Sequence, residues 1–164
     1  MNHKLPVTLS VNQVQHSVKV LAQDTLLAVL RDKLGLIGAK RGCNQGICGT
    51  CTVLKDGSPV RACLSLAINS TDCEITTIEG LATPENLSPL QSALARSGGV
   101  QCGFCTSGML LSAHALLKDN PGPSEDDIRV GLSGNLCRCT GYKKIVEAVL
   151  EAAREIQKMG RAHV

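Results

Sequence analysis

The sequence predicts an α+β protein whose first half mixes strands with a short helix and whose second half is all-helical. Residues 6–11 and 14–20 alternate between apolar and polar side chains, which is the period of a half-buried strand. The dipeptide Asp56-Gly57 is typical of a tight hairpin turn. From residue 88 onward the apolar residues recur at helical spacing instead.

The first half is expected to contain several strands around one helix. Its strands are predicted at Pro6–Val11, Val14–Val20, Thr52–Lys55, Pro59–Ala62 and Glu74–Ile78. The dipeptide Asn12-Gln13 separates the first two, so they are expected to form a hairpin. Asp24 or Thr25 is placed to cap a short helix rich in leucine, and Gly35 is placed to end it.

The second half is separated from the first by Gly80–Leu87, a stretch with Pro and Thr and no periodicity. We therefore expect two domains, residues 1–79 and residues 80–164. Four helices are predicted in the second domain: one that begins at Ser88-Pro89 and ends near Arg96, one over Met109–Leu117, one that starts with a capping box at Ser124–Asp127, and one from Tyr142 to about Lys158.

Composition excludes several classes of function. The 164 residues carry a net charge of +3 and no block of Lys and Arg, so nucleic acid is not an expected partner. With one Phe, one Tyr and no Trp, aromatic platforms for single strands are missing too. No run reaches the roughly 18 apolar residues of a membrane span. The N-terminus has no apolar signal segment, so a cytoplasmic location is expected.

Nine cysteines are many for such a chain, and a reducing compartment favours metal binding over disulfides. Four of them, Cys43, Cys48, Cys51 and Cys63, have the spacing of a plant-type [2Fe–2S] site. An anionic cluster needs inward-pointing backbone N–H groups, and the neighbouring glycines allow the loop to provide them. Those glycines are Gly42, Gly46 and Gly49. A structural zinc site is the alternative for these four thiolates.

A second group consists of a C-x2-C pair, Cys102 and Cys105, and a C-x-C pair, Cys137 and Cys139. The closing pair is tighter than common zinc pairs, which favours a second iron–sulfur site. Zinc and, less well, a redox dithiol remain alternatives from spacing alone.

Three motifs, GCNQGICGTCTV, QCGFCTSGM and GNLCRCTGY, stand in this order along the chain. With them the whole chain resembles the small iron–sulfur subunit of the molybdenum hydroxylases, the xanthine dehydrogenase/aldehyde oxidase family. The resemblance implies an N-terminal β-grasp, ferredoxin-like domain and a C-terminal four-helix domain. It also assigns Cys102, Cys105, Cys137 and Cys139 to a second [2Fe–2S] cluster.

The resemblance implies partners as well. The C-terminal cluster would lie beside a molybdenum–pterin cofactor, in its cytosine dinucleotide form, in a large subunit. Gln101 and Cys139 match positions that approach this pterin in relatives. The N-terminal cluster would face FAD on a medium subunit, and we expect the complex to be a dimer of heterotrimers. The chain would relay single electrons between these centres and make no bonds itself.

Two residues depart from the family pattern. Ser107 replaces a proline that usually follows C-G-x-C-T, so we expect a looser helix start near the second cysteine group. Asn44 replaces a common aspartate after the first cysteine, which removes a negative charge there. Lys40 and Arg41 precede the first cysteine loop, where a solvated face or a contact with a partner is expected.

Two other functions compete with the electron-relay subunit. A structural zinc protein would use the same thiolates as folding ligands and would be colourless. A free-standing two-cluster ferredoxin or redox sensor would have the same clusters and no molybdenum subunit. The residues that select the complex's substrate are expected on the large subunit, outside this chain.

Overall fold

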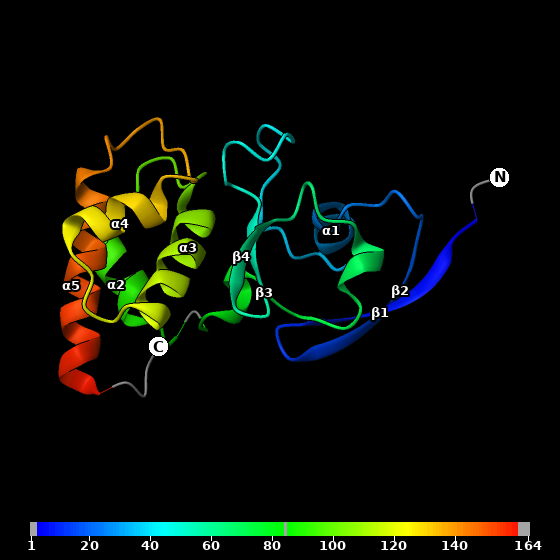
Figure 1. The fold of residues 1–164 in the computed structure, drawn as a ribbon, viewed down its shortest axis with the longest axis horizontal. Helices are drawn as coiled ribbons and strands as arrows, with labels where there is room; N and C mark the ends of the chain where they lie inside the picture. Colours follow the sequence, from blue (N-terminus) through cyan, green and yellow to red (C-terminus); the bar gives the residue numbers. More distant parts are fainter. Residues whose placement is uncertain (1–2, 84, 161–164) are drawn as a thin grey trace.

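The computed structural model describes residues 3–83 and 85–160. The N-terminal half consists of β1 (Leu5–Val11), β2 (Val14–Val20), α1 (Leu26–Ala28), the π-helical turn η1 (Val29–Lys33), β3 (Thr52–Lys55), β4 (Ser58–Arg61), the 3-10 turn η2 (Ala67–Ser70), β5 (Glu74–Thr76) and the 3-10 turn η3 (Ile78–Gly80). The C-terminal half consists of α2 (Pro89–Arg96), α3 (Thr106–Asp119), α4 (Glu125–Leu132) and α5 (Lys143–Met159). In Figure 1 the strands lie on the right and the four helices gather on the left.

The strands form one mixed sheet in the order β2-β1-β5-β3-β4. Strands β1 and β5 are parallel, and the other neighbours are antiparallel. The predicted hairpin is confirmed, because Asn12 and Gln13 have φ of 52° and 67° and form the turn between β1 and β2. The last strand is shorter than predicted, since it ends at Thr76 and the chain turns into η3 at Ile78.

The predicted leucine-rich helix exists, but it is not one regular α-helix. Thr25 caps it, because the Thr25 Oγ1 accepts a hydrogen bond from the Ala28 N–H at 3.2 Å. After three α-helical residues the chain widens into η1, where the Leu34 N–H donates to the Val29 carbonyl. Its apolar face is fully buried against the sheet, namely Leu26, Leu27, Val29 and Leu30.

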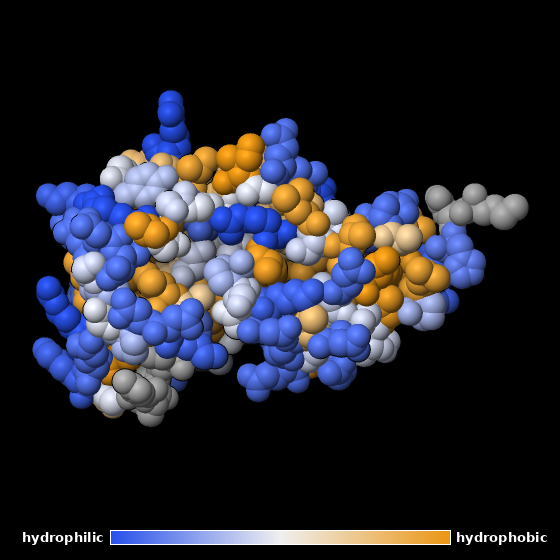
Figure 2. Space-filling view, viewed as in Figure 1, coloured by the Kyte–Doolittle hydropathy of each residue, from blue (hydrophilic) through white to orange (hydrophobic). Residues whose placement is uncertain are grey.

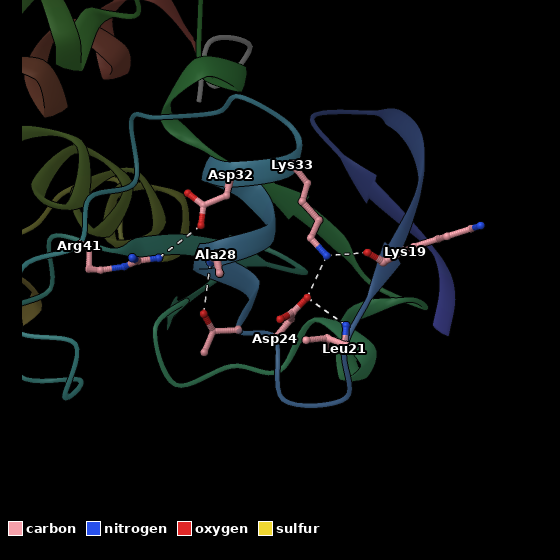
Figure 3. Close-up of polar contacts among 8 residues, drawn as sticks. Lys19, Leu21, Asp24, Ala28, Asp32, Lys33 and Arg41 are labelled. Carbon is pink, nitrogen blue, oxygen red and sulfur yellow. Dashed lines mark hydrogen bonds and ion pairs between the residues drawn. The ribbon is translucent and has the colours of Figure 1, made fainter. Parts of the chain in front are cut away.

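Polar contacts hold this helical segment onto the sheet (Figure 3). The Lys33 Nζ donates to the Asp24 Oδ2 at 2.9 Å and to the Lys19 carbonyl at 2.5 Å. The hydrogen bond from Lys33 is the main reason that the pKa of Asp24 is lowered. Arg41, at the start of the first cysteine loop, lies 3.6 Å from Asp32 of η1. The loop therefore begins on a segment that the sheet already supports.

The four predicted helices are confirmed, with changes at both ends of α3, which runs on to Asp119, and at the start of α5. The predicted N-cap at Ser88 and the predicted capping box at Ser124 are confirmed, and Ser88 also forms a reciprocal capping box, with Gln91. Helix α3 begins at Thr106, three residues earlier than predicted. Tyr142 lies before α5 and not in it, because its φ of 68° is left-handed.

Helix α3 packs against both halves of the molecule (Figure 1). One face contributes to the helical core together with α2, α4 and α5. Its other face packs Leu111 and Ala115 against Leu54 of β3. The turn η3 crosses the expected domain boundary at residue 80, and Ile78 packs both against the helical core and against the contact between Leu54 and α3. The division of the chain into two domains at that residue therefore stays a prediction. None of the helices described here is long and apolar enough to cross a bilayer.

Candidate metal centres

The first cysteine set lies at one end of the β3–β4 hairpin. Cys43 and Cys48 belong to the loop between η1 and β3 and are half-buried. Cys51 immediately precedes β3 and Cys63 follows β4, and both are buried. Because β3 and β4 are paired from Thr52 to Arg61, their outer ends bring Cys51 and Cys63 together.

Backbone amides of the loop point at its sulfurs. The Cys43 Sγ accepts from the N–H groups of Cys48 at 3.3 Å and Gln45 at 3.4 Å. The Cys43 N–H in turn donates to the Cys48 Sγ at 3.4 Å. These donors, first that of Cys48, lower the pKa of the Cys43 thiol to about 6. The loop is therefore already suited to an anionic sulfur.

Cys51, one of the two deeper cysteines, behaves in the opposite way. Burial, the largest cause, raises the pKa of the Cys51 thiol to about 11, and the nearby Cys63 and Cys48 thiols add to it. Thiolate formation at Cys51 would thus depend on a positive ion to compensate for lost solvation. The set divides into an outer pair, Cys43 and Cys48, and an inner pair, Cys51 and Cys63.

The three glycines predicted to shape this loop have different physical roles. Gly46 and Gly49 have φ of 78° and 74°, in the region that side chains rarely adopt. A Cβ on Gly49 would also lie 2.5 Å from the Gly134 carbonyl oxygen, so the two halves could not approach as they do. A Cβ on Gly42 would lie 2.9 Å from the Cys48 Sγ and would intrude on the site itself.

The second cysteine set is assembled from two segments of the helical half. Cys102 and Cys105 precede α3, whereas Cys137 and Cys139 lie between α4 and α5. The Sγ atoms of Cys139 and Cys102 are 3.6 Å apart at the surface. Burial, followed by a hydrogen bond with Cys137, raises the pKa of the Cys105 thiol to about 12. This set also consists of an exposed pair and a deeper pair.

Two residues that sequence reasoning did not single out hold the second C-x-C segment. The Tyr142 hydroxyl accepts from the Cys137 N–H at 2.9 Å and donates to the Asn135 carbonyl at 3.3 Å. The Asn135 side chain is buried and donates from Nδ2 to the Gly49 carbonyl at 3.1 Å. Nothing in the local sequence reveals either contact, because both depend on how distant segments meet.

The two cysteine sets lie on either side of the interface between the N-terminal and C-terminal halves, which we call the seam. The Leu136 N–H donates to the Cys48 carbonyl at 2.9 Å, which connects the residue before Cys137 directly to a cysteine of the first set. Beside it, the Arg61 Nη2 donates to the Gly134 carbonyl at 2.6 Å. A cavity of about 410 Å³ lies between the sets. Its lining includes Cys43, Cys48, Cys102, Cys105, Cys137 and Phe104.

The arrangement of the thiols fits a binuclear iron cluster in each half. Each iron of an all-cysteine [2Fe–2S] cluster is held by two thiolates, so such a site needs two pairs side by side. Both sets provide two pairs. A zinc ion needs four ligands around one point.

The remaining predicted positions lie at the surface or at the seam. Gln101 is exposed beside Cys102, and Arg138 is exposed between the two cysteines of the C-x-C pair. Lys40 is not part of a solvated face, because its side chain turns into the seam between the halves and contacts Ser107. Asn44 has a φ of 56°, a conformation that Asn tolerates better than most residues.

A ferredoxin-like sheet and a helical bundle that each gather two pairs of thiols define a two-cluster iron–sulfur protein. Comparison with known families agrees. Residues 9–76 match the family "2Fe-2S iron-sulfur cluster binding domain", and residues 77–150 match the "[2Fe-2S] binding domain".

Individual relatives cover nearly the whole chain. It is 48% identical over 153 residues to the nicotine 6-hydroxylase small subunit of Paenarthrobacter nicotinovorans, covering 93% of this chain and 92% of that one. It is 44% identical over 168 residues to the aldehyde oxidoreductase iron–sulfur-binding subunit of Escherichia coli (strain K12), covering 93% and 73%. The crystal structure of quinoline 2-oxidoreductase from Pseudomonas putida 86 contains a chain with 43% identity and a TM-score of 0.93, covering 98% and 99%.

The chain therefore belongs to the family of small iron–sulfur subunits of the molybdenum hydroxylases. It is an electron-transfer subunit of an oxidoreductase complex, with a β-grasp, ferredoxin-like domain followed by a helical [2Fe–2S]-binding domain. Its relatives are subunits of larger complexes. The zinc-protein alternative is accordingly not supported.

Proposed function

We propose that this chain holds one [2Fe–2S] cluster in each half and relays electrons from the molybdenum centre of a large subunit to a flavin. The proposed ligands are Cys43, Cys48, Cys51 and Cys63 for the N-terminal cluster, and Cys102, Cys105, Cys137 and Cys139 for the C-terminal cluster. When bound, such a cluster takes up and releases one electron at a time. The protein's contribution is to fix the thiolates, to direct amide donors at sulfur and to control solvation.

The observation that carries the proposal is the direct contact between the two cysteine loops. The Leu136 N–H donates to the Cys48 carbonyl, so one hydrogen bond separates a ligand residue of the first cluster from the peptide that leads to Cys137. A connection this short suits transfer between two centres in one subunit. We propose that electrons pass between the halves through this contact region.

Differences in exposure support the orientation of the relay. Cys102 and Cys139 are the exposed members of the second set, and Gln101 is exposed next to them. We propose that this face meets the pterin of the large subunit, in its cytosine dinucleotide form. Around the first set, Ile47 and Leu64 expose 62% of their surface each. Large apolar side chains so exposed beside a redox site favour a protein partner there.

We propose a medium FAD-binding subunit as that second partner and a dimer of heterotrimers as the complete assembly. Relatives that are subunits of larger complexes support a multi-subunit assembly, and the exposed apolar residues Ile47 and Leu64 would give it a docking face. We further propose a cytoplasmic location, because all nine cysteines are free and cluster assembly requires reduced thiols. The substrate would be selected in the large subunit.

The direct test is electron paramagnetic resonance on the iron-loaded chain after reduction with dithionite. Two distinct [2Fe–2S] signals and four irons per chain are expected. One signal, or none, in fully loaded protein would rule out the proposed relay. Purification from its source then separates two interpretations: a molybdenum subunit that copurifies supports the complex, whereas a stable lone monomer would identify a free-standing ferredoxin.

A further inference from the structure

Lys40 belongs to the N-terminal half, but its side chain extends to the first turn of α3 in the C-terminal half. Its backbone is fixed within the first half, since its N–H donates to the Thr50 carbonyl at 3.0 Å and its carbonyl accepts from the Thr50 Oγ1 at 3.1 Å. The side chain leaves this anchor and is half-buried in the seam. Its ammonium contacts Ser107, two residues after Cys105, which is a proposed ligand of the C-terminal cluster.

Two oxygen atoms hold the ammonium in place. The Lys40 Nζ donates to the Gly38 carbonyl at 3.0 Å and to the Ser107 Oγ at 3.2 Å. Ser107 is 4% exposed, in the first turn of α3, and its own O–H donates to the same Gly38 carbonyl at 2.6 Å. A hydroxyl can donate once and accept at the same time, so the three groups form a closed, compatible set.

The loop that carries these groups is itself held from two sides. The Arg31 Nη1 donates to the carbonyls of Ile37 and Ala39 at 2.7 and 2.6 Å. The Gly38 N–H donates to the Glu79 carboxylate at 2.8 Å. The position of the Gly38 carbonyl, and with it that of the ammonium, is therefore determined by fixed neighbours.

The ammonium is held by neutral oxygen atoms and not by a carboxylate. Lys40 makes no ion pair with a carboxylate within the described part of the chain. Burial is the main reason that its pKa is lowered, and the charge of Arg31 lowers it further, while Glu79 and Cys105 act in the opposite direction. A charge removed from bulk water is screened less by solvent and salt, so its effect on nearby groups is larger.

We propose that Lys40 sets the reduction potential of the C-terminal cluster from the N-terminal half, and that Ser107 positions its ammonium for this role. The proposal rests on the proposed function, because it takes Cys105 as a ligand. Reduction adds a negative charge to a cluster, and a nearby fixed cation stabilises that charge. The C-terminal cluster therefore has a higher potential than its own thiolate shell alone would give it.

The experiment is a redox titration of the full chain, with both clusters loaded, followed by electron paramagnetic resonance. The signal altered by Cys105→Ser identifies the C-terminal cluster. Lys40→Met removes the charge at similar length. This variant is expected to lower the reduction potential of that cluster. At a fixed solution potential, the ratio of oxidised to reduced cluster should rise about tenfold, which corresponds to about 59 mV for one electron. Lys40→Arg, which keeps the charge, is expected to shift the potential less.

Two further variants complete the test. Ser107→Ala keeps the charge but removes one of its two anchors, so a smaller decrease in the same potential is expected. Lys55→Met removes a charge whose Nζ donates to the Asn69 carbonyl, outside both cysteine sets, and should change neither potential. Unchanged potentials in Lys40→Met, or equal shifts of both clusters, would overturn the proposal. Wild-type protein without two [2Fe–2S] signals would instead overturn the proposed function.

A second measurement remains if Lys40→Met fails to assemble its clusters. Acetylation of the intact wild-type chain, followed by peptide mass spectrometry, is expected to modify Lys40 more slowly than Lys55. Ser107→Ala is expected to accelerate the modification of Lys40 alone. Equal rates at the two lysines in the wild type would show that the ammonium is not held in the seam, and the proposal would fail.

Discussion

The two cysteine sets are built in different ways. The N-terminal set is largely the product of one loop, since the amides that donate to Cys43 come from Gln45 and Cys48 of that same loop. The C-terminal set joins two segments with 31 residues between Cys105 and Cys137. Its geometry depends on residues outside those segments.

Contacts with the N-terminal half supply part of that support. The segment before Cys137 donates from Leu136 and Asn135 to the carbonyls of Cys48 and Gly49. Lys40, also of the N-terminal half, contacts Ser107 at the start of α3, the helix that follows Cys105. Because the first loop supplies its own amide donors and the segment before Cys137 is held by contacts with that loop, we expect the second site to depend on the first loop more than the first loop depends on the second site.

Removal of one ligand from each set tests this asymmetry and has the largest expected effect. Cys137→Ala is expected to lose the C-terminal cluster, and half of the iron, while the N-terminal signal remains. Cys63→Ala is expected to lose the N-terminal cluster and also to weaken the C-terminal one, because the first loop relaxes and withdraws its carbonyls. Iron content and electron paramagnetic resonance of the loaded full chain measure both effects. Loss of the N-terminal signal in Cys137→Ala would contradict the comparison.

The next largest effect is expected from Gly49→Ala. The substitution combines a left-handed φ of 74° with a Cβ placed 2.5 Å from the Gly134 carbonyl oxygen, so the two halves would have to separate slightly. Strain and overpacking together are expected to lower the free energy of unfolding by about 3 kcal/mol. Denaturant unfolding of the loaded chain measures the change.

A matched control separates the two causes. Gly98 has a nearly equal φ of 71°, but a Cβ there would meet no atom within 4 Å. Gly98→Ala is therefore expected to cost only the backbone strain, about 1 kcal/mol. Equal losses for Gly49→Ala and Gly98→Ala would mean that the close approach of the first loop to Gly134 contributes little.

Much of the fold follows from local sequence patterns. Alternation and turn residues predict β1, β2 and β3. The N-cap pair Ser88-Pro89 predicts the start of α2, and the capping box at Ser124 predicts the start of α4. What local patterns do not contain is the pairing of distant strands, such as β1 with β5, or the π-helical turn after Ala28. Both depend on how the sheet closes around its core.

The same limit applies to the sites. Spacing alone groups the cysteines, and the structure brings the members of each group together. The supporting residues carry no such signal. Lys40 resembles an ordinary surface lysine in sequence, and Tyr142 resembles a helix residue, although each is fixed by contacts that only tertiary packing creates. Ser107 stands where the resemblance predicts a proline, and its hydroxyl makes a hydrogen bond across the seam that proline cannot make.

The smallest of the expected effects concerns the hydroxyl of Tyr142, which supports the second site from within its own half. Tyr142→Phe keeps the ring but removes the group that bridges the Cys137 N–H and the Asn135 carbonyl. The loss is expected to cost about 1 kcal/mol. The C-terminal cluster should then release its iron to a chelator about fivefold faster, because the segment opens more often. The visible absorbance of each cluster, followed with time, measures the two rates.

The N-terminal cluster provides the internal reference in that experiment, because its amide donors do not involve the Tyr142 segment. Ser133→Ala is a suitable control, since its hydroxyl donates to the Val130 carbonyl at the end of α4 without touching a cysteine segment. If Tyr142→Phe accelerates release from both clusters equally, the whole seam opens as one unit. If only the C-terminal cluster is affected, the second site has its own local support in addition to the carbonyls of the first loop. Its dependence on the first loop is then only partial.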